Sequence, residues 1–383
     1  MNICKKSLFS HLAIRWISMI CLLLFSVVAL ADPWPVAEPE SVGFQKDKLE
    51  KVTEYAKEKT GTTGLVMAVD GKIIYTYGDI RQVSYIASCR KSVLSMLYGK
   101  YVANGTINLD ETVGQLGIDD LQGLLPQEKE ATVYDLITAR SGVYHPASNP
   151  GGIPEGKKYE RGATPHGTRF VYNNWDFNVA GTVFTQKTGL DIFDALERDL
   201  AKPLGMEDFN RARHKLTGNA KMSKHLAYHM HFSTRDMARL GQLMLRKGRW
   251  NGEQLIPEEW VVRSTSVVSP LKGDIHCGYG ILWWLLADKQ YPEQFKGAYS
   301  AEGMYGQFIT VFPAMNMVVA HKSAGNAKKR TTGGQYRHIL RLIVEASLPK
   351  AEGTTAPKAE EAVPKAEETA VPKAKKVVPK AEE

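Results

Sequence analysis

Strand-like sequence lies near both ends of this 383-residue chain, and that placement limits the folds it can form. Near the N-terminus, the runs Leu65–Val69 and Lys72–Tyr77 flank Asp70-Gly71, a dipeptide typical of a two-residue hairpin turn. Later strand-like runs are Tyr279–Leu286, Gln307–Phe312 and Asn316–His321. This arrangement predicts one antiparallel sheet that is built from both ends of the chain.

The other periodic stretches are helical. Apolar spacing predicts helices over residues 47–59, 175–188, 234–247 and about 331–346. The central stretch, roughly 106–270, is otherwise rich in loops. We therefore predict an α+β domain over residues 32–348, with helices flanking the sheet and a separate helical lobe. The cleft between sheet and lobe is the natural place for a site.

Residues 1–31 have the pattern of a secretory signal peptide. Basic residues precede any acidic one, an apolar run covers Ile17–Leu30, and Ala29-Leu30-Ala31 places small residues at the cleavage positions. The run is shorter than the roughly 20 residues that a transmembrane helix needs. We expect cleavage near Ala31 and export to the periplasm or the medium, with an uncleaved anchor as the alternative.

Residues 349–383 repeat a unit that begins Pro-Lys-Ala. Its prolines prevent long helices, and almost no large apolar side chain is available for burial. This composition predicts a disordered tail, which is either a passive spacer or a weak tether to a partner in the cell envelope.

Charge, cysteine and histidine content argue against several classes of function. The formal net charge is +8 without a dense basic stripe, so we expect no nucleic-acid binding. Cys89 and Cys277 are permitted to form a bridge in an oxidising compartment, but free thiols are the favoured reading. His225, His229 and His231 have a spacing that zinc ligands can have, yet no acidic general base lies among them. Packed or surface histidines are favoured, and we expect no metal and no organic cofactor.

Ser88 lies three residues before Lys91 at the start of an apolar segment, Ile86–Leu97, that is predicted to be helical. Residues three apart share a helix face, so the lysine can reach the serine hydroxyl. The free N–H groups of the first helical turn favour negative charge there, and a buried lysine can become a base near neutral pH. We predict a serine nucleophile with a lysine base. The alternative is a helix-capping serine beside a lysine whose amine extends to solvent.

Tyr172-Asn173-Asn174 is the only Tyr-x-Asn sequence in the chain, and it precedes a predicted apolar helix. A tyrosine hydroxyl bridged to Lys91 can relay the serine proton to a leaving group. Asn174 can hold the lysine or accept a substrate amide. The alternative is a buried tyrosine followed by a helix-capping asparagine.

The segment Ser300–Gln307 is rich in glycine and leads into the strand-like run that begins at Gln307. Glycines before an edge strand allow a ligand to approach the backbone closely. Gly303, Met304 and Gln307 are therefore candidate substrate-binding residues, and the N–H groups of Met304 and Ser88 can form an oxyanion hole. The alternative is an ordinary turn.

Two other places are candidates for the edge of the site. Trp283 and Trp284 lie in strand-like sequence, where successive side chains point to opposite faces, so one is expected in the core and the other at the cleft. His145 lies in a loop that can border the site.

The three motifs, in this order, resemble those of the serine β-lactamase and penicillin-binding-protein superfamily, and more closely its class C-like esterase and 6-aminohexanoate-dimer hydrolase branch. Supporting stretches are TVYDLITARSGV, PLGMEDF, YGILWW and the segment that begins FSTRDMARLG, and the likeness covers about residues 38–346. It implies a β-lactamase/transpeptidase-like fold. It also implies that Ser88 is acylated, that Lys91 is its base, that Tyr172 is the second proton carrier beside Asn174, and that Met304 completes the oxyanion hole.

The sequence departs from that family at Ala301-Glu302-Gly303, where the lactamases and peptidases have Lys-Thr-Gly or His-Thr-Gly near the substrate carboxylate. Binding of a penicillin carboxylate is expected to be weaker, and a cleft-facing Glu302 would favour a cationic or neutral substrate. The hydrolase branch has a similar small-x-Gly sequence, followed by Gly-Gln as at Gly306-Gln307. We expect an exported serine hydrolase of small-molecule esters or amides. The alternatives are a β-lactamase or D-Ala-D-Ala peptidase, and a binding or sensor protein without turnover.

Overall fold

The computed structural model describes residues 34–149 and 159–347. The predicted signal peptide and the repeated tail lie outside these residues. Within the two ranges, no helix has the length and apolar character needed to cross a membrane.

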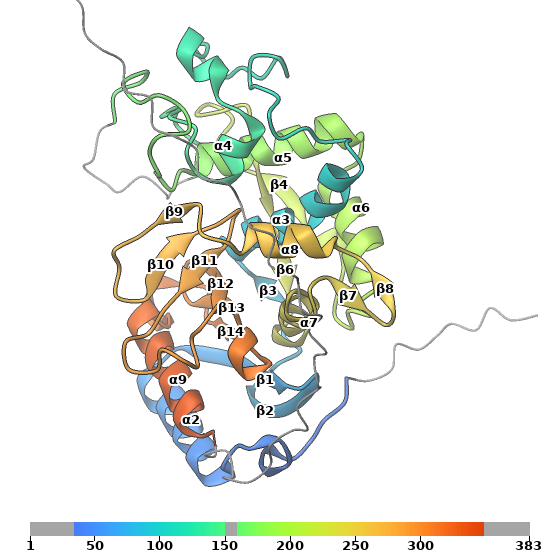
Figure 1. Cartoon of the computed structure of the whole chain (residues 1–383), viewed down its shortest axis with the longest axis vertical. Helices are drawn as coiled ribbons and strands as arrows, with labels where there is room; N and C mark the ends of the chain where they lie inside the picture. The colour runs from blue at the N-terminus through green and yellow to red at the C-terminus, as the bar shows by residue number, and fades with distance from the viewer. Residues whose placement is uncertain (1–33, 150–158, 348–383) are drawn as a thin grey trace, which may run out of the picture. The chain divides into compact units, whose positions relative to one another are not determined.

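An eight-stranded antiparallel sheet forms one lobe, with the strands in the order β2-β1-β14-β13-β12-β11-β10-β9. The first and last strands along the chain, β1 and β14, are hydrogen-bonded neighbours. The prediction of one antiparallel sheet from both chain ends is thus confirmed (Figure 1). The strand bounds are β1 (Thr62–Val69), β2 (Lys72–Gly78), β9 (Ser269–Pro270), β10 (His276–Tyr279), β11 (Trp284–Leu286), β12 (Tyr299–Gly303), β13 (Gln307–Phe312) and β14 (Met317–Ser323).

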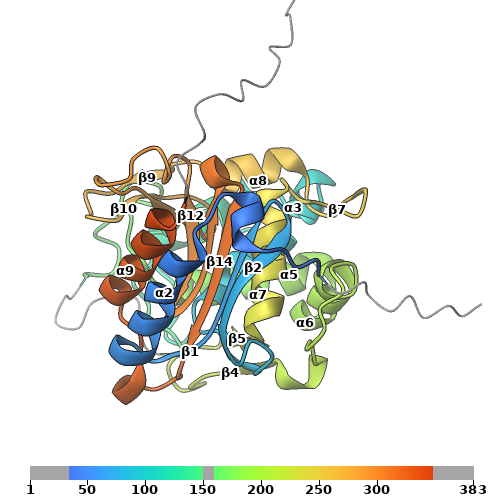
Figure 2. The same cartoon turned by 90° about the horizontal axis from the view of Figure 1, so that it is seen from below.

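Helices cover both faces of this sheet (Figure 2). On one face, α2 (Lys46–Lys59) and α9 (Gly333–Glu345) pack over Leu65 and Met67 of β1. On the other face, α7 (Thr234–Leu245) packs over Val66, the residue between them. Successive strand side chains point to opposite faces, so a strand that is apolar throughout, as β1 is, must be covered on both sides.

The second lobe is mainly helical, as the sequence predicts. Its helix α3 (Cys89–Ala103) lies between the two lobes and packs on β12, β13, α5 and α8. That position explains why almost every residue of α3 is buried. The other helices near it are α4 (Val133–Ile137), α5 (Asn174–Thr188), α6 (Ile192–Leu196) and α8 (Glu258–Ser264). Short strand pairs complete the lobe: β3 (Ser84–Tyr85) with β6 (His231–Phe232), β4 (Lys215–Thr217) with β5 (Ala227–His229), and β7 (Arg249–Trp250) with β8 (Glu253–Gln254).

Two details of the strand prediction were wrong. The run Tyr279–Leu286 is not one strand, because β10 ends at Tyr279 and β11 begins at Trp284. Between them Leu282 adopts a left-handed φ of 63°, which reverses the chain. The strand that begins at Gln307 is not an edge strand either, since β13 lies between β12 and β14.

Lys322 on β14 joins the sheet to the β3–β6 pair. Its side chain is buried, and its Nζ donates hydrogen bonds to the carbonyl oxygens of Ser84, at 2.9 Å, and Phe232, at 2.6 Å. Burial lowers the pKa of Lys322 from 10.5 to about 7. Between these two values the unfolded chain binds more protons than the folded chain at this site. The contribution of Lys322 to the free energy of unfolding therefore rises with pH across that window.

We expect Lys322→Met to remove this dependence. The free energy of unfolding of the wild type minus that of the variant should rise by up to about 1.4 kcal/mol per pH unit above pH 7. Urea unfolding at several pH values measures it, with the exposed Lys51→Met as control. A difference that stays constant with pH would show that Lys322 remains charged in the folded protein.

Candidate active site

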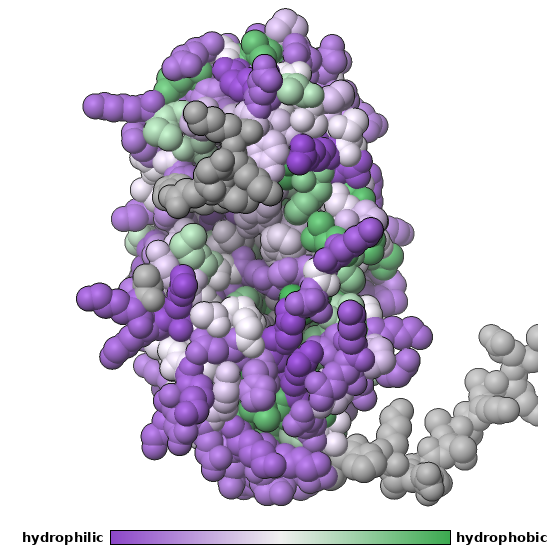
Figure 3. All heavy atoms as spheres, turned by 90° about the vertical axis from the view of Figure 1, so that its left-hand side faces the viewer, coloured by the Kyte–Doolittle hydropathy of each residue, from purple (hydrophilic) through white to green (hydrophobic). Residues whose placement is uncertain are grey.

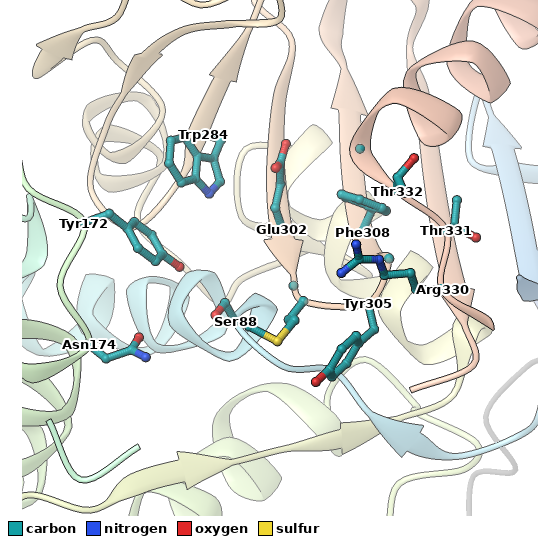
Figure 4. A pocket seen from close by; sticks show the side chains of 14 residues that line it. Ser88, Tyr172, Asn174, Trp284, Glu302, Tyr305, Phe308, Arg330, Thr331 and Thr332 are labelled. Carbon is teal, nitrogen blue, oxygen red and sulfur yellow. The ribbon is translucent and has the colours of Figure 1, made fainter. Parts of the chain in front are cut away.

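Ser88 is the N-cap residue of α3, and Lys91 follows one helical turn later. The residue before the serine, Ala87, has a φ of +49°, a left-handed conformation that residues other than glycine rarely adopt. Such backbone strain is found at functional sites, where the surrounding structure maintains it. The tight turn places Ser88 at the edge of the cleft, with its side chain between Tyr172 and Tyr305 (Figure 4).

Lys91 connects the residues that the sequence singled out. Its Nζ lies within hydrogen-bond distance of Ser88 Oγ, at 3.1 Å, and of Tyr172 OH, at 2.6 Å. It also donates a hydrogen bond to Asn174 Oδ1, at 2.7 Å. The lysine side chain is only 2% exposed, and its Nζ lies 4.3 Å from the ring centre of Phe177. The structure thus brings Ser88, Lys91, Tyr172 and Asn174 together, although they come from two distant parts of the chain.

The surroundings of Lys91 favour the neutral amine. Burial lowers the pKa of Lys91 well below its ordinary value, and the positive charge of Arg90 lowers it further. Arg90 is itself buried, donates a hydrogen bond to Asn178 Oδ1 at 3.0 Å and lies over the ring of Tyr228. Helical spacing does not predict this effect of Arg90, because the side chain at an adjacent helical position normally points elsewhere.

The surroundings of Tyr172 favour its protonated, neutral form. Burial raises the pKa of Tyr172 well above its ordinary value, so its hydroxyl retains its proton at neutral pH. Its ring stacks on Trp284 with 5.2 Å between ring centres. Asn173 caps α5 through a bond from the Trp175 N–H, which leaves Asn174 to contact Lys91. The site therefore pairs a weakly basic amine with a neutral phenol.

A cavity of about 490 Å³ opens beside Ser88. It is lined by Ser88, Tyr172, Asn174, Trp284, Glu302, Gly303, Met304, Tyr305, Gly306, Phe308, Arg330, Thr331, Thr332 and Gly333. Figure 3 shows a largely polar face of the molecule, with apolar side chains near a hollow at mid-height. The cavity includes every predicted site residue except Lys91, which lies beneath it, and Gln307.

Gln307 lies behind the cavity rather than in its wall. Its side chain is 1% exposed, and Nε2 donates to the Ser323 carbonyl oxygen at 3.0 Å. Its own carbonyl oxygen accepts a bond from Cys89 Sγ, next to the serine. Gln307 therefore fastens β13 to β14 and to the start of α3.

Gly303 allows β12 to approach the residues before Ser88. A Cβ atom at this position would lie 2.4 Å from the carbonyl oxygen of Ile86. Met304, the next residue, lines the cavity and is 53% exposed. The close approach places the start of the 304–306 turn beside the serine.

We expect Gly303→Ala to separate β12 from the serine turn. A clash with backbone cannot be relieved by a rotamer change, so the free energy of unfolding should fall by about 1–3 kcal/mol, and kcat should fall with it. Thermal unfolding and ester turnover measure the two effects. Gly325→Ala, where a Cβ meets no atom within 4 Å, is the control. Equal behaviour of the two variants would contradict the role given to Gly303.

Sequence reasoning missed the partner of Glu302. The carboxylate lines the cavity, and its Oε1 lies 2.9 Å from Nε2 of His276 on β10. Trp284 lines the same wall, whereas Trp283 is fully buried, so the predicted division of the two tryptophans holds. Arg330 was also missed. No local signal marks these positions, because the contacts depend on the order of strands in the sheet.

The remaining candidates lie away from the cavity. His145 is buried, with Nε2 2.8 Å from the Leu121 carbonyl oxygen. His229 and His231 belong to strands β5 and β6, so they share no helix face with His225. No group of three potential metal ligands occurs in the part of the chain that the structure describes. Cys89 and Cys277 are free thiols.

The sequence matches the family model described as Beta-lactamase over residues 50–341. The chain belongs to the beta-lactamase family. A 6-aminohexanoate-dimer hydrolase homologue from Bacillus anthracis is similar in structure, with a TM-score of 0.57 and 18% identity over 82% of this chain and 86% of the other. No functionally curated protein matches the sequence significantly.

Two further structures share the fold. A penicillin-binding-protein homologue from Caulobacter crescentus has a TM-score of 0.54 and 16% identity over 78% of this chain and 95% of the other. A class C β-lactamase in complex with cefoxitin has a TM-score of 0.57 and 16% identity over 78% and 98%. At these identities the likeness establishes the β-lactamase/transpeptidase-like fold, an antiparallel sheet flanked by helices, and no substrate.

Proposed function

We propose that this beta-lactamase-family hydrolase cleaves an ester or amide through an acyl-enzyme at Ser88, with Lys91 and Tyr172 as proton carriers. One observation carries the proposal. A buried Lys91 amine lies within hydrogen-bond distance of the hydroxyls of both Ser88 and Tyr172, at the edge of an open cavity. The nucleophile, a base and an acid are thus in contact before substrate arrives.

In acylation, the neutral Lys91 amine takes the proton of Ser88 Oγ while this oxygen attacks the substrate carbonyl carbon. The N–H groups of Ser88 and Met304 stabilise the negative charge on the carbonyl oxygen. As the bond to the leaving group breaks, the Tyr172 hydroxyl protonates the departing oxygen or nitrogen and recovers a proton from Lys91. Asn174 holds the amine in place throughout.

In deacylation, a water molecule attacks the ester formed at Ser88. The Lys91–Tyr172 pair accepts a proton from the water, and one returns to Ser88 Oγ when the acid product leaves. The pair then has its original protonation, so no cofactor is required for the cycle.

The cavity wall favours esters or amides without a carboxylate in the position that penicillins use. Glu302 and Ala301 stand where the family's peptidases and lactamases carry a hydroxyl and a cation. We therefore expect the kcat/KM for p-nitrophenyl butyrate to be at least about 100-fold above that for nitrocefin. The nitrocefin carboxylate would meet the negative charge of Glu302 and would lack the family's hydroxyl donor, which together should cost about 3 kcal/mol of transition-state binding. Steady-state kinetics on both substrates, normalised to the fraction of protein that reacts with a fluorophosphonate probe, provides the test.

Two outcomes would overturn parts of the proposal. Faster nitrocefin turnover would identify a β-lactamase. Stable labelling of Ser88 by both substrates with no turnover would identify a binding or sensor protein.

We also propose that the chain is exported after cleavage near Ala31, which N-terminal sequencing of the protein from the producing cells would test.

A further inference from the structure

Glu302 gives the cavity a negative charge close to the proposed leaving-group position. It is the only carboxylate among the cavity-lining residues within the described parts of the chain. Its side chain is 23% exposed, and among the described residues its carboxylate accepts one hydrogen bond, from His276 to Oε1. The second carboxylate oxygen is therefore available to a ligand.

An aromatic wall leads from Tyr172 to this carboxylate. Trp284 stacks on Tyr172, with ring centres 5.2 Å apart, and its ring centre lies 4.6 Å from that of His276, with the two planes tilted. Glu302 and Trp284 extend into the same part of the cavity (Figure 4). A leaving group that is protonated by Tyr172 must start at one end of this wall and can extend along it to Glu302.

We propose that the leaving group of the substrate is an alcohol, thiol or amine that also carries a permanently cationic group, and that the Glu302 carboxylate binds this group at the end of the aromatic wall. A carboxylate in the cavity wall suits an ammonium group because it attracts positive charge, and the aromatic side chains beside it tolerate the apolar substituents on the nitrogen. This inference rests on the proposed function, since it assigns the leaving-group side from the role of Tyr172.

The positive charge of Arg330 repels a cationic group from another part of the cavity, which supports binding of that group at Glu302. Arg330 lines the cavity beside Phe308, on the side of Glu302 away from Trp284 (Figure 4), and it is solvent-exposed. No carboxylate within the described ranges forms an ion pair with it. A positive group is repelled at that end of the cavity and attracted at Glu302. The charges thus select the direction in which a singly cationic leaving group lies.

Thioesters that differ only in charge test the proposal. Butyrylthiocholine has a trimethylammonium group on the leaving thiol, and S-(3,3-dimethylbutyl) thiobutyrate has a neutral tert-butyl group of the same shape. We expect the wild type to hydrolyse the cationic thioester with a kcat/KM about tenfold or more above the neutral one, as a single contact between an ammonium group and a carboxylate supplies. Released thiol is measured with a disulfide reagent.

Single substitutions show which residue causes the preference for the cationic thioester. Glu302→Gln should lower the ratio of the two kcat/KM values to about one while the neutral thioester is still hydrolysed. Glu130→Gln, an exposed acid in the helical lobe, should keep the wild-type ratio. Arg330→Gln removes a positive charge from the cavity and should leave the ratio of the two kcat/KM values unchanged or raise it. A wild-type ratio near one, or a ratio unchanged in Glu302→Gln, would overturn the inference.

The same experiment separates this inference from the proposed function. Hydrolysis of both thioesters without charge preference leaves the Ser88 mechanism standing and removes only the role of Glu302. Absence of thioester hydrolysis together with absence of fluorophosphonate labelling at Ser88 would remove both.

Discussion

Replacing Ser88 by alanine is expected to abolish ester hydrolysis, with a loss of at least about 10⁴-fold in kcat and no change in fold. The proposed acyl bond forms on Oγ, and no neighbouring hydroxyl can take its place, since Tyr172 retains its proton. The substitution removes one hydrogen bond at the edge of an open cavity, so the free energy of unfolding should change by less than about 1 kcal/mol. Ester turnover and thermal unfolding measure both quantities.

A matched serine on the same helix provides the control. Ser92 Oγ is buried and donates to the Leu282 carbonyl oxygen at 2.6 Å. Ser92→Ala should lower stability by about 1 kcal/mol and leave kcat within a few-fold. Intact-mass spectrometry after fluorophosphonate treatment should show one adduct in the wild type and Ser92→Ala, and none in Ser88→Ala. Unchanged turnover in Ser88→Ala would rule out the mechanism.

The sequence predicts those parts of the site that depend on local geometry. Ser88 and Lys91 are three residues apart on a helix, so their contact follows from helical spacing alone. Tyr172 and Asn174 reach the same lysine from 81 and 83 residues further on, which spacing cannot predict. The chemistry of these side chains suggested the contact, and the resemblance to a known family supported it. Gln307 lies in the right segment, but its place in the strand directs its side chain away from the cavity.

The fold shows the same division between local and long-range information. The β1–β2 hairpin could be predicted because Asp70 and Gly71 both adopt the positive φ that its turn requires. The break between β10 and β11 could not, since the run Tyr279–Leu286 is apolar throughout and its reversal depends on Leu282 in a left-handed conformation. Gly280 also packs against the Ser264 carbonyl oxygen, a contact made with a distant helix. The pairing of His276 with Glu302 is a consequence of that reversal.

Lys91→Ala is expected to lower kcat/KM by several orders of magnitude, because the serine loses its proton acceptor and Tyr172 loses its proton source. The buried position of Lys91 predicts the shape of the pH profile. Only the neutral amine accepts a proton, so activity should rise with pH through the lowered pKa of Lys91 and then reach a plateau. The raised pKa of Tyr172 keeps the plateau level up to about pH 10.

Two further variants separate the base from its surroundings. Lys100→Ala removes an exposed lysine from the same helix, paired with Asp199 at 2.9 Å, and should leave the pH profile unchanged. Tyr172→Phe removes only the hydroxyl and should also cost several orders of magnitude, because lysine and tyrosine act as one proton-transfer unit. A mild effect at Tyr172 would leave Lys91 as the sole proton carrier. An acidic limb that persists in the residual activity of Lys91→Ala would assign the base to another group.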